Sequence, residues 1–286
     1  MDIKWLSVLF LVAAMLFGSP VTEYARGEEN AEKRGYKEIY PRNIVEAGPF
    51  YYFEEYDELL VRFYTILFDK YSLAGLIELF KKEGGLSGCE RILDIGTGTG
   101  SLGFAAIAYG GGRVVGTELD PLAVKNARYN IKRFGLEDIF EVREVPFDSP
   151  SAYSVIKDKE KFDLIISDPP QSYDEGDRRP FPEAGWDAGG TREAFFTRDE
   201  GYGLLKSLVE GLRGRLNENG RALLMMKNPK GISMLKSLAA KNGIELKMVY
   251  STQKELDPLD KRFIGRNTRM PNMGRNMMIF ELRPEK

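Results

Sequence analysis

The chain has 286 residues, a net charge of −2, no histidine and a single cysteine, Cys89. Its 43% hydrophobic and 29% charged residues are ordinary for a globular protein, and the acidic balance does not suggest a bulk nucleic-acid binder. Without histidine, a Ser-His-Asp triad and a zinc site are essentially excluded, and one cysteine cannot form an internal disulfide. We therefore expect no metal, and chemistry based on carboxylates, backbone carbonyls, aromatic rings or a cofactor.

Residues 1–20 resemble a signal peptide or a short membrane anchor. An uncharged apolar run, residues 5–17, follows Lys4 and is shorter than the roughly 20 residues of a full membrane span. The cleavage site is poor. Three alternatives stay open: an export signal, an anchor that gives membrane association, and a mis-called start with translation from Met15.

Two further segments precede the regular pattern. Residues 21–39 are polar, lack an apolar period and predict a linker. Residues 40–87 form an N-terminal helical and aromatic segment, in which we expect two helices. The first helical pattern is Leu59, Leu60, Phe63, Ile66 and Leu67, and the second is Leu76, Ile77 and Phe80, ended by Gly84 and Gly85.

From Arg91 onward, strands and helices alternate, so residues 88–286 form the main domain. The alternation predicts an α/β fold with a mostly parallel seven-stranded sheet and helices on both faces. The last two strands have no helix between them, so we expect an antiparallel last strand. The expected strands are 92–95, 114–118, 139–142, 162–167, 222–226, 244–250 and 277–282, and the expected helices are 102–109, 121–134, 205–216 and 232–241.

The first of these strands ends in a glycine-rich turn with the sequence ILDIGTGTGSLG, residues 92–103. Its glycines let the chain turn sharply and let the backbone approach a ligand. Such a turn also fits a nicotinamide dehydrogenase, or a tight turn beside a surface acid. However, Asp94 would repel a pyrophosphate and suits a cationic ligand, while Glu118 after the second strand can accept ribose hydroxyls. Together the two acids favour a positively charged nucleoside.

The motifs ILDIGTGTGSLG, VVGTELDPLAVKNARYN and FDLIISDPP resemble the class I S-adenosylmethionine-dependent methyltransferases, over about residues 88–283. This resemblance implies a Rossmann-like fold, S-adenosylmethionine as the cofactor and methyl transfer as the activity. It also implies which residues contact the cofactor. They are Asp94 at the amino group, Gly96, Gly98 and Gly100 on the methionine and ribose side, Glu118 at the ribose, and Leu119 and Asp148 at the adenine.

The fourth strand ends in Asp168-Pro169-Pro170-Gln171, which resembles the Asp/Asn-Pro-Pro-Tyr/Phe motif of methyltransferases that modify planar amino groups. The Asp168 side chain and the Pro169 carbonyl would accept the two N–H bonds of the amino nitrogen, and the prolines stiffen the loop. Pro170, Gln171 and Tyr173 would contact the substrate. Gln171 departs from the aromatic of the motif, so stacking would pass to Tyr173 or to residues 50–56. The structural alternative is that the prolines simply end a strand.

The layout is similar to the small-domain and protein-glutamine methyltransferase-like group, including a segment at 185–190. Residues 40–87 would then be the substrate side. The basic loop 261–276 is either solvated or a contact for a protein or nucleic-acid acceptor. We expect methylation of a planar amino nitrogen of protein or RNA. Alternatives are a small-molecule methyltransferase and a non-catalytic, membrane-tethered binding module. Residues 1–20 favour an exported or membrane-associated protein, whereas the cofactor supply favours the cytoplasm.

Overall fold

The computed structural model describes residues 50–53, 55–56, 58–62, 66, 69–148, 150–170, 203–251 and 277–285, and three residue pairs at 172–173, 196–197 and 263–264. The predictions for residues 1–20 and 21–39 lie outside the described residues. So do those for Gln171, for residues 185–190 and for the basic loop apart from positions 263–264.

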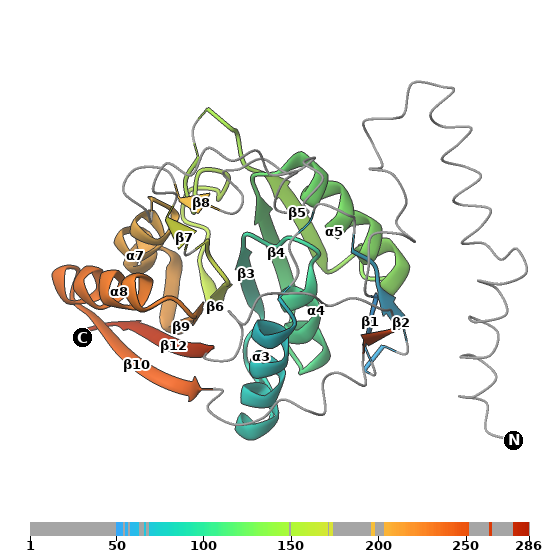
Figure 1. Ribbon diagram of the computed structural model, residues 1–286, viewed down its shortest axis with the longest axis horizontal. Coiled ribbons are helices and arrows are strands. Elements are labelled where there is room, and N and C mark those ends of the chain that lie inside the picture. Colours follow the sequence, from blue (N-terminus) through green and yellow to red (C-terminus); the bar gives the residue numbers. More distant parts are fainter. Residues whose placement is uncertain are drawn as a thin grey trace, which may run out of the picture.

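A seven-stranded sheet forms the centre of the molecule, in the order β10-β12-β9-β6-β3-β4-β5 (Figure 1). The pairs β5–β4, β4–β3, β3–β6 and β6–β9 are parallel, and β12 is antiparallel to both β9 and β10. This confirms the predicted sheet and its antiparallel last strand. The strands are β3 (Arg91–Ile95), β4 (Arg113–Glu118), β5 (Phe140–Glu144), β6 (Phe162–Ser167), β9 (Leu216–Met226), β10 (Ile244–Ser251) and β12 (Met278–Pro284).

Helices cover both faces of the sheet, as predicted. One buried cluster joins the sheet to α3 (Lys70–Glu83), α4 (Ser101–Ala108) and α5 (Pro121–Phe134). A second cluster joins the opposite face to α7 (Gly203–Arg215) and α8 (Pro229–Lys241). Neighbouring β3 residues alternate between the two, with Ile92 in the first cluster and Leu93 in the second. Since each strand residue faces the opposite side from the next, both faces need apolar cover.

The helix ends follow local signals in the sequence. Asp120 caps α5 by accepting a hydrogen bond from the Leu122 amide at 2.8 Å, and Pro121 occupies the first turn. Gly135 closes the helix with a φ of 65°. Asp69 caps α3 in the same way, through the amides of Tyr71 and Ser72. These caps fix the helix starts at the carboxyl ends of the strands.

The first predicted helix is wrong where the structure describes it. Glu58–Leu60 is strand β2, which pairs antiparallel with β1 (Phe50–Phe53), and β1 also pairs with β11 (Phe263–Ile264). The helical spacing of the leucines is overridden because β2 pairs with the preceding strand β1, which β11 from far along the chain pairs with on its other edge. This three-stranded sheet, β11-β1-β2, is called the small sheet below.

Two other boundaries also differ from the prediction. Leu216 begins β9 instead of ending a helix, and Asn219 and Gly220 lie within that strand. Between the expected strand 162–167 and the expected helix 205–216, where no element is expected, β7 (Ser172–Tyr173) pairs in parallel with β8 (Phe196–Thr197). Pairing with partners far along the chain explains each difference.

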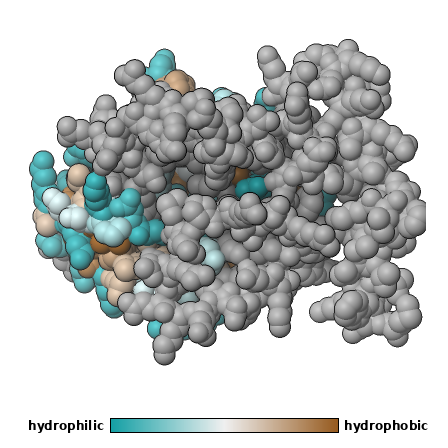
Figure 2. All heavy atoms as spheres, in the orientation of Figure 1, coloured by the Kyte–Doolittle hydropathy of each residue, from teal (hydrophilic) through white to brown (hydrophobic). Residues whose placement is uncertain are grey.

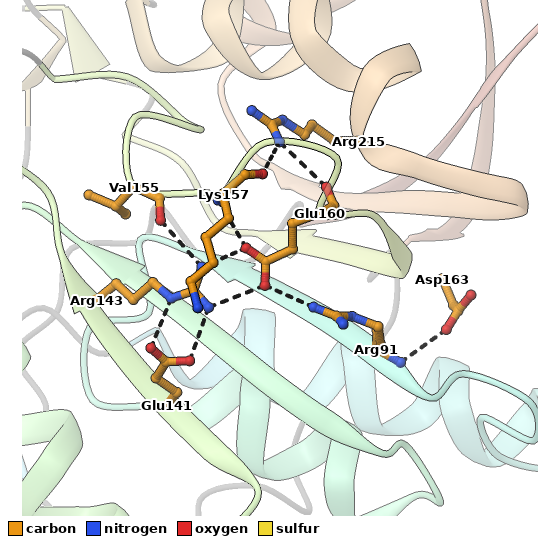
Figure 3. A network of polar contacts seen from close by, with 8 residues as sticks. All are labelled: Arg91, Glu141, Arg143, Val155, Lys157, Glu160, Asp163 and Arg215. Atoms are coloured by element: carbon orange, nitrogen blue, oxygen red, sulfur yellow. Dashed lines mark hydrogen bonds and ion pairs between the residues drawn. The ribbon is translucent and has the colours of Figure 1, made fainter.

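An ion-pair network fastens the loop before β6 to strands β3 and β5 (Figure 3). The Glu160 carboxylate accepts from Arg143 Nη1 at 2.7 Å and from Arg91 Nη2 at 2.8 Å. It also accepts from the Lys157 amide at 3.0 Å, while Arg143 Nε donates to Glu141 at 2.9 Å. Two guanidinium groups and one backbone amide thus hold the Glu160 carboxylate against the sheet.

The described surface over α8 and β10 mixes hydrophilic and hydrophobic areas (Figure 2). The exposed large hydrophobic side chains, Phe147, Met234 and Met248, lie on separate elements. Within the described part of the chain, no helix is both long and apolar enough to cross a membrane. The same residues contain no cluster of three or more potential metal ligands from Cys, Asp or Glu.

Candidate functional site

The sequence motifs meet at the carboxyl ends of three adjacent parallel strands. Ile95 at the end of β3 pairs with Thr117 on β4 and with Ser167 on β6. The Ser167 hydroxyl donates to the Ile95 carbonyl at 2.9 Å, which ties the two strand ends together. The glycine turn, Glu118 and Asp168 therefore lie at one edge of the sheet, where ligands bind in open α/β folds.

Asp94 is fully buried, so it is not the surface acid of the structural alternative. Its Oδ2 atom accepts from the Thr97 hydroxyl at 2.7 Å and from the Gly103 amide at 3.2 Å. Its Oδ1 atom is buried and has no hydrogen-bond partner among the described residues. Burial raises the pKa of Asp94 to about 7; the bonds from Thr97 and Gly103 oppose the shift and Glu118 adds to it. A buried acceptor without a partner indicates a missing donor.

Glu118 joins the end of β4 to the glycine turn. Its Oε2 atom accepts from the Gly98 amide at 2.9 Å, and Oε1 accepts from the amides of Leu119 and Asp120 at 2.8 and 3.0 Å. Burial raises the pKa of Glu118, and these backbone bonds oppose the shift. A carboxylate has about four acceptor positions, so about one remains for a ligand hydroxyl. Glu118 retains 9% exposure, which leaves part of it accessible.

The glycine turn provides space that a larger residue would remove. Gly96 has a φ of +72°, and no heavy atom of the described residues lies within 4 Å of the position that a Cβ would take. Gly100 has a φ of +90°, and a Cβ there would lie 2.7 Å from the Phe104 ring. The turn therefore requires glycine for its backbone conformation at both places, and Gly96 faces open space where a ligand can approach.

Asp168 lies in a cluster of charges that the sequence motif does not reveal. Lys227, which follows β9, places its Nζ atom 3.1 Å from Asp168 Oδ2 and 3.4 Å from Oδ1. The same Nζ atom pairs with Asp69, the capping residue of α3. Two carboxylates thus hold one ammonium group, and Asp168 is oriented by a residue from a different strand.

The charged groups in this cluster change one another's pKa values. Burial raises the pKa of Asp168, Lys227 opposes that shift and Asp69 adds to it. Burial lowers the pKa of Lys227, but the two carboxylates outweigh burial and raise it overall. Lys227 is therefore a cation at neutral pH and not a nucleophile. Its signal in the sequence is a lysine directly after a buried strand, at the sheet edge where the other motifs end.

The remaining predicted site residues differ in how deeply they are buried. Pro169 is buried, Pro170 and Leu119 are half-buried, and Leu119 follows Glu118 directly. Asp148 is exposed on the segment after β5, and its contact with adenine stays a prediction. Tyr173 lies in β7, where it pairs with Thr197 of β8. The structure thus brings Asp94, the glycines, Glu118 and Asp168 to one edge.

The comparison with known proteins finds similarity in the part of the sequence that forms this edge of the sheet. The sequence model of one protein family, described as ribosomal protein L11 methyltransferase (PrmA), matches residues 75–168. The ribosomal protein L11 methyltransferase of Desulforamulus reducens is 43% identical over 60 residues, which cover 21% of this chain and 20% of that protein. That of Pelobacter propionicus is 42% identical over 66 residues, which cover 23% and 21%. The chain thus spans about a fifth of the length of the curated relatives it matches.

Solved structures extend the similarity to the whole fold. The ribosomal protein L11 methylase from Lactobacillus delbrueckii subsp. bulgaricus aligns with a TM-score of 0.50 and 16% identity, covering 80% of this chain and 87% of that one. The hMettl16 catalytic domain, solved with a MAT2A 3′UTR hairpin, aligns with a TM-score of 0.50 and 14% identity, covering 82% and 77%. The fold is therefore the Rossmann-like methyltransferase fold, and its class I members use S-adenosylmethionine.

Proposed function

We propose that this protein is an S-adenosylmethionine-dependent methyltransferase that methylates a planar amino nitrogen of a protein or RNA acceptor. The observation that carries the proposal is the buried Oδ1 atom of Asp94, which has no partner among the described residues and lies beside the glycine turn. A buried carboxylate oxygen needs a donor, and a cationic amino group supplies one. The match of the PrmA family over residues 75–168 includes this acid, the turn and Glu118.

The cofactor would be held by residues already fixed by the fold. Asp94 Oδ1 would accept from the amino group, the open side of Gly96 would admit the ligand, and the remaining acceptor position of Glu118 would bind a ribose hydroxyl. When bound, S-adenosylmethionine supplies an electrophilic methyl group on a positively charged sulfur. Leu119 and Asp148 remain proposals for the adenine side.

The acceptor would be held at Asp168 and Pro169. A conjugated amino nitrogen is a weak nucleophile because its lone pair is delocalised. Accepting its two N–H bonds on the Asp168 carboxylate and the Pro169 carbonyl would aim the lone pair at the methyl group. Lys227 would hold the carboxylate in place, since its Nζ atom lies 3.1 Å from Oδ2. The proton released after transfer would pass to Asp168, whose pKa burial raises.

The matched relatives favour a protein as the first acceptor to test. Their names identify a ribosomal protein as the substrate of those enzymes. A glutamine side-chain amide, as in the protein-glutamine group, is a planar amino group of the required kind. RNA is the alternative acceptor of the same chemistry.

The experiment separates cofactor binding from transfer at Asp168. Calorimetry measures S-adenosylmethionine binding, and labelled cofactor measures transfer into the protein and RNA fractions of a cell lysate. We expect Asp168→Ala to bind the cofactor within about threefold of wild type and to lose about 100-fold in transfer rate, the effect of removing one acceptor of the reacting group.

Asp168→Asn is the matched control, because asparagine keeps a side-chain carbonyl oxygen at the same place. This variant should retain transfer within about tenfold of wild type. Transfer by Asp168→Ala at the wild-type rate would show that the assigned acceptor role is wrong. Absence of cofactor binding by the wild-type protein would remove the proposed function itself.

A further inference from the structure

Two asparagines of α5 bind the backbone of the segment that follows the small sheet. Asn126 and Asn130 are both fully buried. The Val61 carbonyl accepts from Asn126 Nδ2 at 2.9 Å and from Asn130 Nδ2 at 2.8 Å, and the Val61 amide donates to Asn130 Oδ1 at 2.9 Å. Asn130 thus pairs with Val61 much as a strand neighbour would, although they lie far apart in the sequence.

Asn130 makes one more bond, and that bond reaches the glycine turn. Its Nδ2 atom also donates to the Thr99 carbonyl at 2.9 Å. Thr99 lies between Gly98 and Gly100, and the Gly98 amide is bound by Glu118. The Asn130 side-chain amide therefore connects the segment after β2 with the turn that faces the expected cofactor. It is held by hydrogen bonds to Val61 on one side and to Thr99 on the other.

The segment before β2 is docked on the same part of the molecule. Tyr56 donates its hydroxyl hydrogen to the Phe104 carbonyl of α4 at 2.7 Å, and its ring centroid lies 4.9 Å from that of Phe134 on α5. Figure 1 shows β1 and β2 beside α5. The small sheet is therefore attached to the two helices that begin after the glycine turn and after Glu118.

We propose that Asn130 is a positioning residue that couples the glycine turn to the small sheet, so that cofactor binding and docking of residues 58–62 strengthen each other. The inference rests on the proposed function for the identity of the cofactor. Gly96, Gly98 and Gly100 take left-handed conformations, and the bond from Asn130 to the Thr99 carbonyl is one of those that hold the turn in this shape. A buried amide that satisfies groups on both sides makes the order of one side depend on the other.

Coupling of this kind is reciprocal. If docking of residues 58–62 strengthens cofactor binding, cofactor binding must protect the same residues by the same factor. The small sheet also contains β11, so a segment from near residue 264 is connected to the cofactor turn through β1, β2 and Asn130.

The first test measures S-adenosylmethionine binding by calorimetry in the full chain and two variants. Asn126→Ala is the matched control, because it removes a bond to the same Val61 carbonyl and leaves the bond from Asn130 to Thr99 in place. We expect Asn130→Ala to weaken binding by about tenfold, the typical effect of leaving a buried polar group unsatisfied, and Asn126→Ala to stay within about twofold. Thermal unfolding of both variants shows that each is folded at the assay temperature.

The second test needs no variant that could fail to fold. Hydrogen exchange of the amides of residues 58–62 is followed in the wild-type protein with and without the cofactor. We expect the cofactor to slow their exchange, and the slowing to persist in Asn126→Ala and to be lost in Asn130→Ala.

Each outcome has a separate meaning. If wild-type protein binds S-adenosylmethionine but the exchange of residues 58–62 does not change, or if Asn130→Ala binds as wild type does, the coupling is overturned and the proposed function stands. If both asparagine variants weaken binding equally, Asn130 has only a structural role and the coupling is again overturned. If the wild-type protein binds no cofactor, both proposals fall.

Discussion

Glu160 and Asp94 both have little exposed side chain, but their carboxylates differ in the partners that they have. The comparison shows how the same chemical group can either stabilise the fold or be left able to bind a ligand. The Glu160 side chain is 7% exposed and accepts from Arg91, Arg143 and the Lys157 amide (Figure 3). Asp94 is fully buried, and one of its two oxygens has no partner among the described residues. The first charge is neutralised by two guanidinium groups, and the second meets no cation among the residues that the structure describes.

The pKa shifts of the two groups run in opposite directions. Burial raises the pKa of Glu160, but its bonds to Arg143 and the charge of Arg91 outweigh burial and lower it overall. Burial raises the pKa of Asp94 to about 7, and among the described residues only the bonds from Thr97 and Gly103 oppose the shift. A carboxylate that is costly to ionise in the free protein is one that a cationic ligand can stabilise.

The largest expected effect is on ligand binding at Asp94. Asp94→Asn removes the charge and keeps the shape, so we expect S-adenosylmethionine to bind about 100-fold more weakly, which is about 2.7 kcal/mol. Calorimetry measures the affinity, and circular dichroism checks that the fold is retained. Equal affinity in the variant would show that Asp94 does not hold the cationic group.

The same acid-to-amide change at Glu160 should affect stability and leave binding alone. Glu160→Gln leaves Arg91 and Arg143 without their shared carboxylate, and we expect the free energy of unfolding to fall by about 2 kcal/mol, because Arg91 is half-exposed and water partly replaces its bond. Urea denaturation measures this loss. The affinity for S-adenosylmethionine should stay within about twofold of wild type, because the network is separate from the glycine turn. A large loss of affinity would mean that the two regions are not independent.

A smaller effect is expected from pH. The raised pKa of Asp94, about 7, means that its carboxyl gains a proton as the pH falls through neutrality. Only the ionised form attracts a cationic amino group, so the affinity should fall about eightfold between pH 7.5 and pH 6. Calorimetry across this range measures how the affinity depends on pH. Asp158→Asn changes an exposed acid and should leave the shape of this pH profile unaltered. A flat profile would place the cationic group elsewhere.

Local signals explain why much of the fold could be predicted. Asp120, Pro121 and Gly135 mark both ends of α5, and the cap and the closing glycine are where the sequence places them. The glycine turn and Glu118 could likewise be assigned to one sheet edge, because parallel strands end on the same side. Such features depend on neighbours within a few residues or on the alternation of strands and helices.

The errors arose where backbone pairing or tertiary contact overrides local spacing. Leu59 and Leu60 have helical spacing, yet they pair with Tyr51 and Tyr52 of the preceding strand, to which β11 from far along the chain is also paired. The charge cluster at Asp168 is a similar case, because Lys227 and Asp69 come from a different strand and a helix start. Only the order of strands in the sheet brings these residues together, and spacing along the chain does not reveal that order.

The place of β12 has a consequence for synthesis. This strand sits inside the sheet, between β9 and β10, yet the ribosome makes it after both. Until residues 278–284 have been made and have left the ribosome, β9 and β10 lack the antiparallel partner that β12 supplies in the described sheet. Strand edges that lack their partner are open to chaperones or to other chains.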